Sequence, residues 1–276
     1  MAKARFISPS IVLFFGEGFR VVFCGETAAT ISKISNMIKR LVLRSGFFRI
    51  WRALRRSFSF RKRMLEELFW MSHFDRRLKS RKRLEGVDLR LGNWALGPAG
   101  MSILLDTLTQ VRNPRVLELG LGESSKIVAQ TLESDNHLVI DHDESWVKHW
   151  TTQQEQRGAP VPKIEVFPMR FSKKRSQYDF GEKRIGEGFN VFLVDGPFGS
   201  RNESRRNILD IADEWTTNQE FVVIIDDVHR VGELQTYAAL KEKLRSKGIG
   251  FKSRKITDLK EVGVVCSMHY WQLLSI

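Results

Sequence analysis

The hydrophobic pattern changes along the chain near residue 90. From about Gly92 onward, short continuous runs of Val, Ile, Leu and Phe alternate with longer stretches whose apolar residues recur at helical spacing. Continuous apolar runs of strand length are typical of strands buried on both faces, and their alternation with helices predicts a parallel sheet covered on both sides. We therefore expect an α/β fold, a doubly wound, mostly parallel seven-stranded sheet, over residues 91–276.

The expected elements follow from these runs. Predicted helices cover residues 124–132, 144–156, 205–215 and 232–247. Predicted strands cover residues 115–119, 137–140, 163–167, 190–194, 221–225, 250–256 and 263–274. The last two strands are joined by a short turn, which predicts an antiparallel hairpin at the sheet edge.

Residues 1–90 have a different pattern, which predicts a basic, amphipathic helical extension. Over residues 31–60 apolar side chains recur at helical spacing and Lys and Arg occupy much of the remaining circumference, and a second helical stretch, 61–83, ends in RRLKSRKR. Residues 1–90 hold 21 of the 45 Lys and Arg but only 7 of the 32 Asp and Glu, a net charge of +14, so the other 186 residues carry −1.

This charge asymmetry indicates an anionic partner for the extension. A basic helix with Trp and Phe on its apolar side is typical of membrane-surface helices, so residues 31–83 are predicted to contact an anionic membrane surface. Two alternatives stay open. The helices could pack on the main domain with their charges solvated, or they could bind nucleic acid, which we consider the weaker alternative.

No segment is predicted to span a membrane. The most apolar stretch, Ile11 to Gly25, is interrupted by Gly16, Glu17, Gly18 and Arg20 and falls short of the roughly 18 to 20 clean apolar residues of a span. Two cysteines, Cys24 and Cys266, provide no disulfide framework and favour a reducing compartment. We therefore predict a cytoplasmic protein that could also attach peripherally to the inner face of the membrane.

The stretch VLELGLGESS, Val116 to Ser125, is the first chemical motif. Gly120 and Gly122 directly follow the first predicted strand and precede a helix, at the edge of the sheet where open α/β folds bind ligands. The dinucleotide fingerprint G-x-G-x-x-G is incomplete, because its third position is Ser125.

Two carboxylates narrow the choice of ligand. Glu118, two positions before the first glycine, would repel a pyrophosphate and favour a cationic group, although it could also simply cap the next helix. Asp141 ends the next strand, where a carboxylate can accept both hydroxyl hydrogens of a ribose. A cationic group joined to a ribose indicates S-adenosylmethionine.

These residues resemble a known family. VLELGLGESS and VIDHDESW resemble the first two motifs of class I S-adenosylmethionine-dependent methyltransferases. LVDGPFG and VIIDDVHR are similar to the turns after strands four and five in bacterial sugar- and polysaccharide-associated O-methyltransferases. The resemblance covers roughly residues 92–274. It implies a Rossmann-like methyltransferase fold and a cofactor site formed by Glu118, Gly120, Gly122 and Asp141.

A second acidic group lies at neighbouring strand ends. Asp195 ends one predicted strand and Asp226 and Asp227 end the next; adjacent parallel strands are about 4.8 Å apart, so the carboxylates can converge around a cation. Oxygen ligands suit Mg²⁺ or another divalent cation. The resemblance to metal-dependent relatives implies Asp195, Asp226 and Asp227 as metal ligands, but Gly196-Pro197 departs from their usual pattern.

Without a metal, the same residues take other roles. Asp195 or His229 could serve as the general base that accepts the proton of a hydroxyl group. Arg201, Arg205 and Arg206 could hold an anionic acceptor or form an exposed basic helix face.

The predicted function is S-adenosylmethionine-dependent O-methylation of a sugar or glycan-lipid hydroxyl. One rival is an RNA methyltransferase whose basic extension binds phosphates. The near-neutral catalytic domain and the lack of an N/D-P-P-Y/F turn disfavour it. The other rival is a non-catalytic binding protein on the same fold, which the intact glycine pair, Glu118 and Asp141 disfavour.

Overall fold

The computed structural model describes residues 11–15, 19–23, 46–92, 95–172 and 174–275. The chain divides into two compact units, Met1–Arg61 and Lys62–Ile276. This boundary lies earlier than the predicted one at 90/91. The reason is that Trp70, Phe74 and Leu84 are buried in the core of the larger unit.

The smaller unit contains an antiparallel hairpin of β1 (Ile11–Phe15) and β2 (Phe19–Phe23), with Ile11 opposite Phe23. The extension is therefore not entirely helical, because its most apolar stretch consists of two short apolar runs, IVLFF and FRVVF, which pair as strands. Residues 31–45 of the helix predicted over 31–60 lie outside the described residues. From there a single helix, α2 (Gly46–Lys79), replaces the two predicted ones. No helix among the described ranges is long and apolar enough to cross a bilayer.

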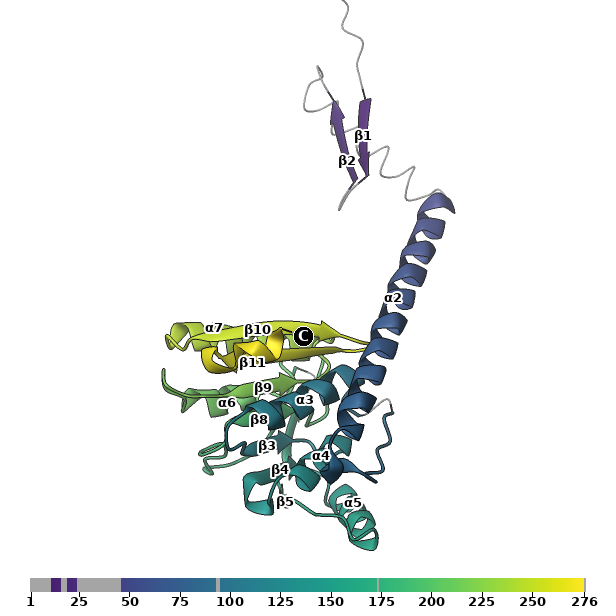
Figure 1. Ribbon diagram of the computed structural model, residues 1–276. Coiled ribbons are helices and arrows are strands. Elements are labelled where there is room, and N and C mark those ends of the chain that lie inside the picture. Colours follow the sequence, from purple (N-terminus) through teal and green to yellow (C-terminus); the bar gives the residue numbers. More distant parts are fainter. Residues whose placement is uncertain (1–10, 16–18, 24–45, 93–94, 173, 276) are drawn as a thin grey trace, which may run out of the picture. The chain divides into compact units, whose positions relative to one another are not determined.

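The larger unit is built on a seven-stranded sheet of order β10-β11-β9-β8-β3-β4-β5 (Figure 1). Six strands run in the same direction and β11 runs antiparallel to both of its neighbours, as expected for the doubly wound, mostly parallel fold. The strands are β3 (Val116–Leu119), β4 (His137–Asp141), β5 (Lys163–Val166), β8 (Val191–Val194), β9 (Val222–Ile225), β10 (Phe251–Thr257) and β11 (Glu261–Ser267).

All seven predicted strands are present, with one correction. The last was predicted to reach Leu274 but ends at Ser267, and Met268–Leu274 forms the 3₁₀-helix η3. Tyr270 and Leu273 of η3 are buried in the core, so the apolar residues there mark a helical turn packed on the sheet.

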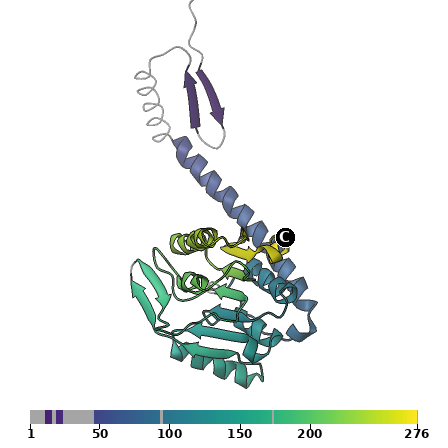
Figure 2. The same ribbon diagram turned by 90° about the vertical axis from the view of Figure 1, so that its left-hand side faces the viewer.

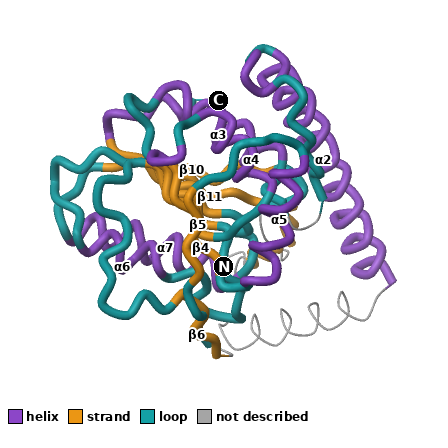
Figure 3. Tube along the Cα trace, turned by 90° about the horizontal axis from the view of Figure 1, so that it is seen from below, coloured by secondary structure: helices purple, strands orange, loops and turns teal. Residues whose placement is uncertain are grey.

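Helices cover both faces of this sheet. In Figure 3, α3 (Pro98–Gln110), α4 (Glu123–Thr131) and α5 (Glu144–Gln156) lie on one side, with α6 (Asn207–Asp213) and α7 (Val231–Ser246) on the other. Alternate strand residues point to opposite cores. Val116 packs with α3 and α4, whereas Leu117 packs with α6 and α7. Helices α4 to α7 were predicted within two residues at each end, and α3 was not predicted.

The chain reverses direction across the sheet between β3 and β8. From β3 it proceeds outward through β4 and β5, then returns to place β8 on the other side of β3. The carboxyl ends of β3 and β8 therefore flank the switch point where open α/β folds bind ligands. An additional hairpin, β6 (Met169–Ser172) and β7 (Arg175–Tyr178), was not predicted.

The C-terminal hairpin β10–β11 closes one edge of the sheet beside α2, as Figure 2 shows in yellow and blue. Its turn is fixed to α2 by a hydrogen bond from the Leu259 amide to Glu67 Oε2 at 3.0 Å. Asp258 accepts from the amides of Ala99 at 3.1 Å and Lys260 at 2.7 Å. This turn is consequently held close to the start of α3.

Candidate functional site

A cavity of about 520 Å³ opens at the carboxyl ends of β3, β4, β8 and β9. Its walls include six candidate site residues from the sequence: Gly120, Gly122, Asp141, Asp195, Arg205 and Asp227. Three other predicted site residues, Glu118, Asp226 and His229, are not part of its lining. The switch point of the sheet therefore contains a concave site at the position expected from the glycine motif.

The glycine loop forms one wall through its backbone. Gly120 has a φ of +106°, and a Cβ on this residue would lie 2.8 Å from the amide nitrogen of Gly196. The Gly196 amide donates a hydrogen bond to Leu119 O at 2.5 Å, and the Gly196–Pro197 peptide bond is cis. The loops after β3 and β8 thus touch, which brings the two predicted ligand-binding regions together.

Asp141 faces the cavity in a fixed orientation. Its Oδ2 accepts from the Leu121 amide at 2.8 Å, and its Oδ1 accepts from the amides of His142 at 2.6 Å and Asp143 at 3.1 Å. Each carboxylate oxygen can accept two hydrogen bonds, so Oδ2 retains a free lone pair for a ligand hydroxyl. Next to it, Asp143 caps the N-terminus of α5.

Glu118 has a different role from the predicted one. Its side chain is fully buried, Ser124 Oγ donates to its Oε1 at 2.5 Å, and its Oε2 lies 3.0 Å from His137 Nε2. Both carboxylate oxygens are therefore bound by neighbours behind the loop. Glu118 fixes α4 and β4 to the glycine turn, and the expectation that it contacts a cationic ligand directly is not met.

The second acidic group converges as predicted. Val194 of β8 lies opposite Ile225 of β9, so Asp195 and Asp226 leave the sheet at the same level. One carboxylate oxygen from each of Asp195, Asp226 and Asp227 lies within 4.8 Å of the others. By this distance alone the three residues could share a cation.

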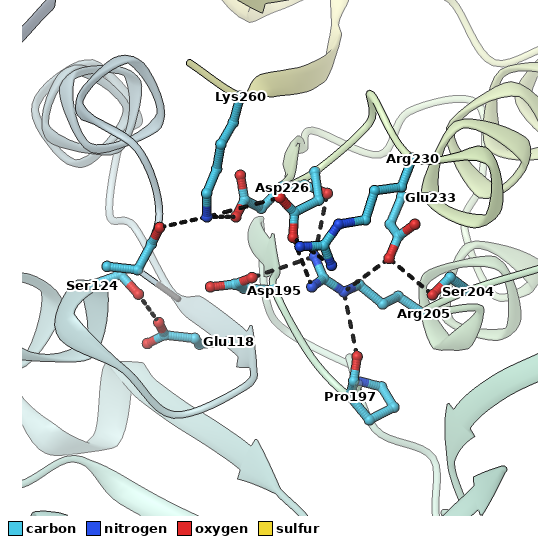
Figure 4. A network of polar contacts seen from close by, with 12 residues as sticks. Glu118, Ser124, Asp195, Pro197, Ser204, Arg205, Asp226, Arg230, Glu233 and Lys260 are labelled. Carbon is cyan, nitrogen blue, oxygen red and sulfur yellow. Dashed lines mark hydrogen bonds and ion pairs between the residues drawn. The ribbon is translucent and has the colours of Figure 1, made fainter. Parts of the chain in front are cut away.

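Three cationic side chains already occupy this group (Figure 4). Arg205 lies 3.3 Å from Asp195 Oδ1 and 3.3 Å from Asp227 Oδ2. Lys260 Nζ lies 3.3 Å from Asp226 Oδ2, and Arg230 lies 3.1 Å from Asp227 Oδ2. We call the connected set the ion-pair network; its members are Asp195, Asp226, Asp227, Glu233, Arg205, Arg230 and Lys260.

Arg205 was expected either on an exposed helix face or holding an acceptor. Its side chain lines the cavity and is only 5% exposed, which rules out the exposed face; it also donates to Pro197 O at 3.3 Å and Asp226 O at 3.2 Å. Lys260 and Arg230 were not predicted. Arg230 ends the VIIDDVHR motif but was given no role there, and Lys260 lies in a stretch where no motif was identified.

The charges of the ion-pair network decide whether a divalent cation fits. With every group ionised, four carboxylates face three cations, which leaves a formal charge of −1. Asp226 Oδ1 and Asp227 Oδ1 are buried and have no hydrogen-bond donor within the described part of the chain. A dication would reverse the charge of the network and lie beside the Lys260 ammonium, so these residues do not fit a divalent metal well.

Asp195 is the better placed of the two candidate bases. Its carboxylate lines the cavity, and burial, followed by the neighbouring Asp226, raises its pKa well above the usual range, with Arg205 and Lys260 acting in the opposite direction. His229 lies outside the lining, with Nδ1 4.0 Å from Asp227 Oδ1 and 32% of its side chain exposed. The geometry therefore favours Asp195 for proton transfer.

Tyr178 is a site residue that the sequence did not reveal. It lies in the unpredicted β6–β7 hairpin, is 1% exposed and lines the cavity against Gly196. Its hydroxyl has no partner within the described ranges, and burial raises its pKa well above the usual range. A buried hydroxyl without a partner at a cavity wall indicates a ligand that supplies one.

Aromatic rings form the rim. The rings of His142 and Phe198 meet edge to face at 4.9 Å between centroids. Phe198 is 57% exposed and Trp146 is 42% exposed, and both line the cavity. The site therefore combines a charged floor with flat apolar surfaces at its entrance.

No family model matches this chain, and no curated protein is significantly similar to it. Its solved structural neighbours include methyltransferases of low similarity. One is the Pyrococcus abyssi tRNA (uracil-54, C5)-methyltransferase in complex with S-adenosylhomocysteine. It has a TM-score of 0.35 and 13% identity, over 60% of this chain and 37% of that one.

Two other neighbours are covered over most of their length. Precorrin-6y C5,15-methyltransferase from Geobacter metallireducens has a TM-score of 0.41 and 9% identity, over 65% of this chain and 94% of that one. An S-adenosylhomocysteine-bound methyltransferase of Podospora anserina has a TM-score of 0.41 and 10% identity, over 72% of this chain and 87% of that one. At these values the neighbours do not establish this chain's activity or substrate.

Proposed function

We propose that this chain is an S-adenosylmethionine-dependent methyltransferase that methylates a hydroxyl group of a sugar or a glycan-lipid. The cavity lies at the switch point of the sheet, and its volume of about 520 Å³ is in the range of small-molecule sites. S-adenosylhomocysteine occurs in two of the neighbours above, which is consistent with this cofactor.

The observation that carries the proposal is the orientation of Asp141. Backbone amides hold its carboxylate at the cavity wall and leave Oδ2 able to accept from a ribose hydroxyl. Across the cavity, the ion-pair network retains a single negative charge, which complements the single positive charge of a sulfonium. A ribose and a monocation are the two ends of S-adenosylmethionine that a protein can recognise without a phosphate site.

The proposed reaction is an in-line displacement at the methyl carbon. The acceptor oxygen forms a bond to this carbon while the carbon–sulfur bond breaks, and its electron pair stays on the sulfur of S-adenosylhomocysteine. Asp195 accepts the proton of the hydroxyl group, for which its raised pKa makes it a stronger base than an exposed carboxylate. The enzyme's main contribution is placement of the two reactants.

The rim supports a sugar as the acceptor. Phe198 follows Asp195 by three residues, and its exposed ring borders the same cavity. Apolar faces of sugar rings can pack on such a ring while their hydroxyl groups reach the polar floor. Arg90 and Arg230 also line the cavity and would pair with an acidic substituent on the acceptor.

Calorimetric titration of S-adenosylmethionine and S-adenosylhomocysteine tests the cofactor site. We expect micromolar binding to the wild type and a loss of about 10- to 100-fold in Asp141→Ala, the usual effect of removing a charged hydrogen-bond acceptor. Asp179→Ala is the matched control, since Asp179 pairs with Arg170 at 2.7 Å outside the cavity lining. Absence of binding to the wild type would contradict the proposal. A screen of sugars and glycan-lipids then tests the acceptor.

We further propose that the protein attaches peripherally to an anionic membrane surface, at the cytoplasmic face where glycan-lipids are assembled. On α2 the side chains of Leu65, Leu68 and Phe69 are 68%, 58% and 55% exposed, and Lys62 nearby is 79% exposed. Exposed apolar residues beside basic ones suit the interface of an anionic bilayer.

Sedimentation with anionic vesicles at low salt tests this attachment. We expect the wild type to sediment and the triple variant Leu65→Ser, Leu68→Ser, Phe69→Ser to sediment less. Val231→Ser on α7, which is 59% exposed, is the control. Failure of the wild type to sediment would contradict the proposal. If the rival RNA function holds, the triple variant retains a salt-dependent RNA affinity, because phosphate contacts come from Lys and Arg.

A further inference from the structure

We propose that Lys260 and Arg205 take the place of a divalent cation in this site, so that the acidic group works as a metal-free ion-pair network. The converging carboxylates are what a metal centre would require, but their compensating charges come from the chain itself (Figure 4). The catalytic part of this inference rests on the proposed methyl transfer, whereas its metal-binding part does not.

Lys260 belongs to the turn between β10 and β11, which places its side chain in the ion-pair network. Its Nζ donates to Ala95 O at 2.8 Å and to Asp226 Oδ2 at 3.3 Å, and it lies 3.8 Å from Asp227 Oδ1. Its side chain is 18% exposed and lines the cavity. These hydrogen bonds use two of the three ammonium donors, so one N–H remains to face a ligand oxygen.

The turn that carries Lys260 is itself fixed. Asp258 is fully buried, accepts from the Lys260 amide, and would meet a Cβ on Gly97 if one were added. The ammonium is therefore held between the start of α3 and the end of β9 by packing as well as by charge. A long, exposed lysine that only happened to approach the acids would lack this support.

Arg205 compensates the other side of the network. It is 5% exposed and contacts Asp195, Asp227 and Glu233 at 3.3, 3.3 and 3.8 Å. Arg205 and Asp227 both have left-handed backbone conformations, with φ of 56° and 61°. Such conformations are costly for residues with side chains and persist where surrounding contacts require them, which is common at functional sites.

A divalent ion would compete with these side chains. It requires about six oxygen ligands at 2.0–2.6 Å, and the oxygens of Asp226 and Asp227 that it would use border the Lys260 ammonium. The network has one net negative charge, so it accommodates a single positive charge and not two. Water can donate to the unpartnered Asp226 Oδ1, and water or an acceptor hydroxyl can donate to Asp227 Oδ1, since Asp227 lines the cavity.

Binding of Mn²⁺, measured by electron paramagnetic resonance on the full chain, tests the metal-binding part without any turnover. We expect no stoichiometric site in the wild type at millimolar Mn²⁺. Lys260→Met keeps the aliphatic stem and removes the charge, and should create one Mn²⁺ site that Asp226→Asn in the same chain abolishes. Lys255→Met is the control, because Lys255 lies on the same hairpin, is 45% exposed and pairs with Glu261.

Two results would overturn the inference. A single Mn²⁺ site in the wild type that Asp226→Asn removes would make the group a metal centre. A properly folded Lys260→Met, verified by thermal unfolding, that gains no Mn²⁺ site would show that Lys260 does not occupy the place of a metal.

The catalytic part has its own readout. Wild-type turnover should be unchanged by a chelator, and Lys260→Met should lower kcat by about 10²-fold, as for other lost electrostatic contacts. Added Mn²⁺ should restore part of that loss in Lys260→Met but not in Lys260→Met with Asp226→Asn. Turnover that stops with a chelator in the wild type would contradict the inference. If the wild type binds no S-adenosylmethionine, it is the proposed function that fails, and the Mn²⁺ results stand by themselves.

Discussion

The backbones of Gly120 and Gly196 are in direct contact, since a Cβ on Gly120 would lie 2.8 Å from the Gly196 nitrogen and 3.1 Å from its Cα. One glycine follows β3 and the other follows β8, so this contact joins the two loops that border the cavity. Any side chain at either position would push the loops apart.

The first prediction concerns Gly120→Ala. The added methyl group would be strained at a φ of +106° and would meet Gly196. The substitution should therefore lower the free energy of unfolding by about 1–3 kcal/mol and abolish cofactor binding. Gly158→Ala is the control, with a φ of +62° and no atom within 4 Å; it should cost about 1 kcal/mol and leave binding intact. Urea unfolding and calorimetry measure both effects. Full cofactor affinity in Gly120→Ala would contradict the role of this contact.

Tyr178→Phe should separate binding from stability. The hydroxyl has no partner within the described chain, so removing it should leave the unfolding free energy unchanged or slightly higher. If a ligand uses this hydroxyl, cofactor affinity or kcat should fall about 10-fold. Tyr270→Phe should lower the free energy of unfolding and leave cofactor binding and turnover unchanged. Its hydroxyl donates to Glu220 Oε2 at 2.7 Å, and neither residue is part of the cavity lining. Unchanged binding and turnover in Tyr178→Phe would refute this use of the hydroxyl.

The rate of methyl transfer should depend on pH through Asp195. The group must be ionised to accept a proton, and burial raises its pKa well above the usual range. We therefore expect kcat/KM to fall as the pH is lowered through this raised pKa, at a pH where exposed carboxylates are still ionised. Asp195→Asn should reduce kcat by about 10²- to 10⁴-fold with little change in cofactor affinity. A flat pH profile together with an active Asp195→Asn would remove Asp195 as the base.

Asp258 should make folding stability depend on pH in the opposite sense to most carboxylates. Burial raises its pKa to about 6, although the Lys260 and Ala99 amides oppose the shift. Between about pH 4 and 6 the unfolded chain has already lost this proton while the folded protein retains it. Rising pH therefore lowers the unfolding free energy across this window, by at most about 3 kcal/mol.

Comparison with Asp258→Asn isolates this contribution. The variant does not titrate and keeps an acceptor oxygen for one of the two amides, a loss that does not depend on pH. The unfolding free energy of the wild type minus that of the variant, from urea titrations between pH 4 and 7.5, should decrease as the pH rises. A constant or increasing difference would show that Asp258 has no raised pKa.

The strand ends of the site could be predicted because buried parallel strands leave a clear pattern. Apolar runs ending in Asp141, Asp195 and Asp226 identify residues at one edge of the sheet, and the register of β8 and β9 confirms that the last two lie at the same level. Glu118 was placed wrongly because it lies within β3, on the same face as Val116, where α4 and β4 meet it.

The remaining site residues depend on tertiary contacts that leave no local pattern. Lys260 lies in a hairpin turn and Tyr178 lies in a short strand pair, and nothing within a few residues of either marks it as functional. Arg205 follows a turn where basic residues are usually solvated. Helix α3 was missed because 11 of its 13 residues are buried, which removes the polar side of the helical period.

The position of Lys260 also bears on synthesis. This residue follows its contacts Ala95 and Asp226 by 165 and 34 positions along the chain. Because chains are made from the N-terminus, the carboxylates of β8 and β9 are present before the lysine that compensates them. A chain that stops before β10 and β11 therefore lacks the ammonium group that compensates Asp226, and the proposed site is complete only once this hairpin has been made and has closed the sheet.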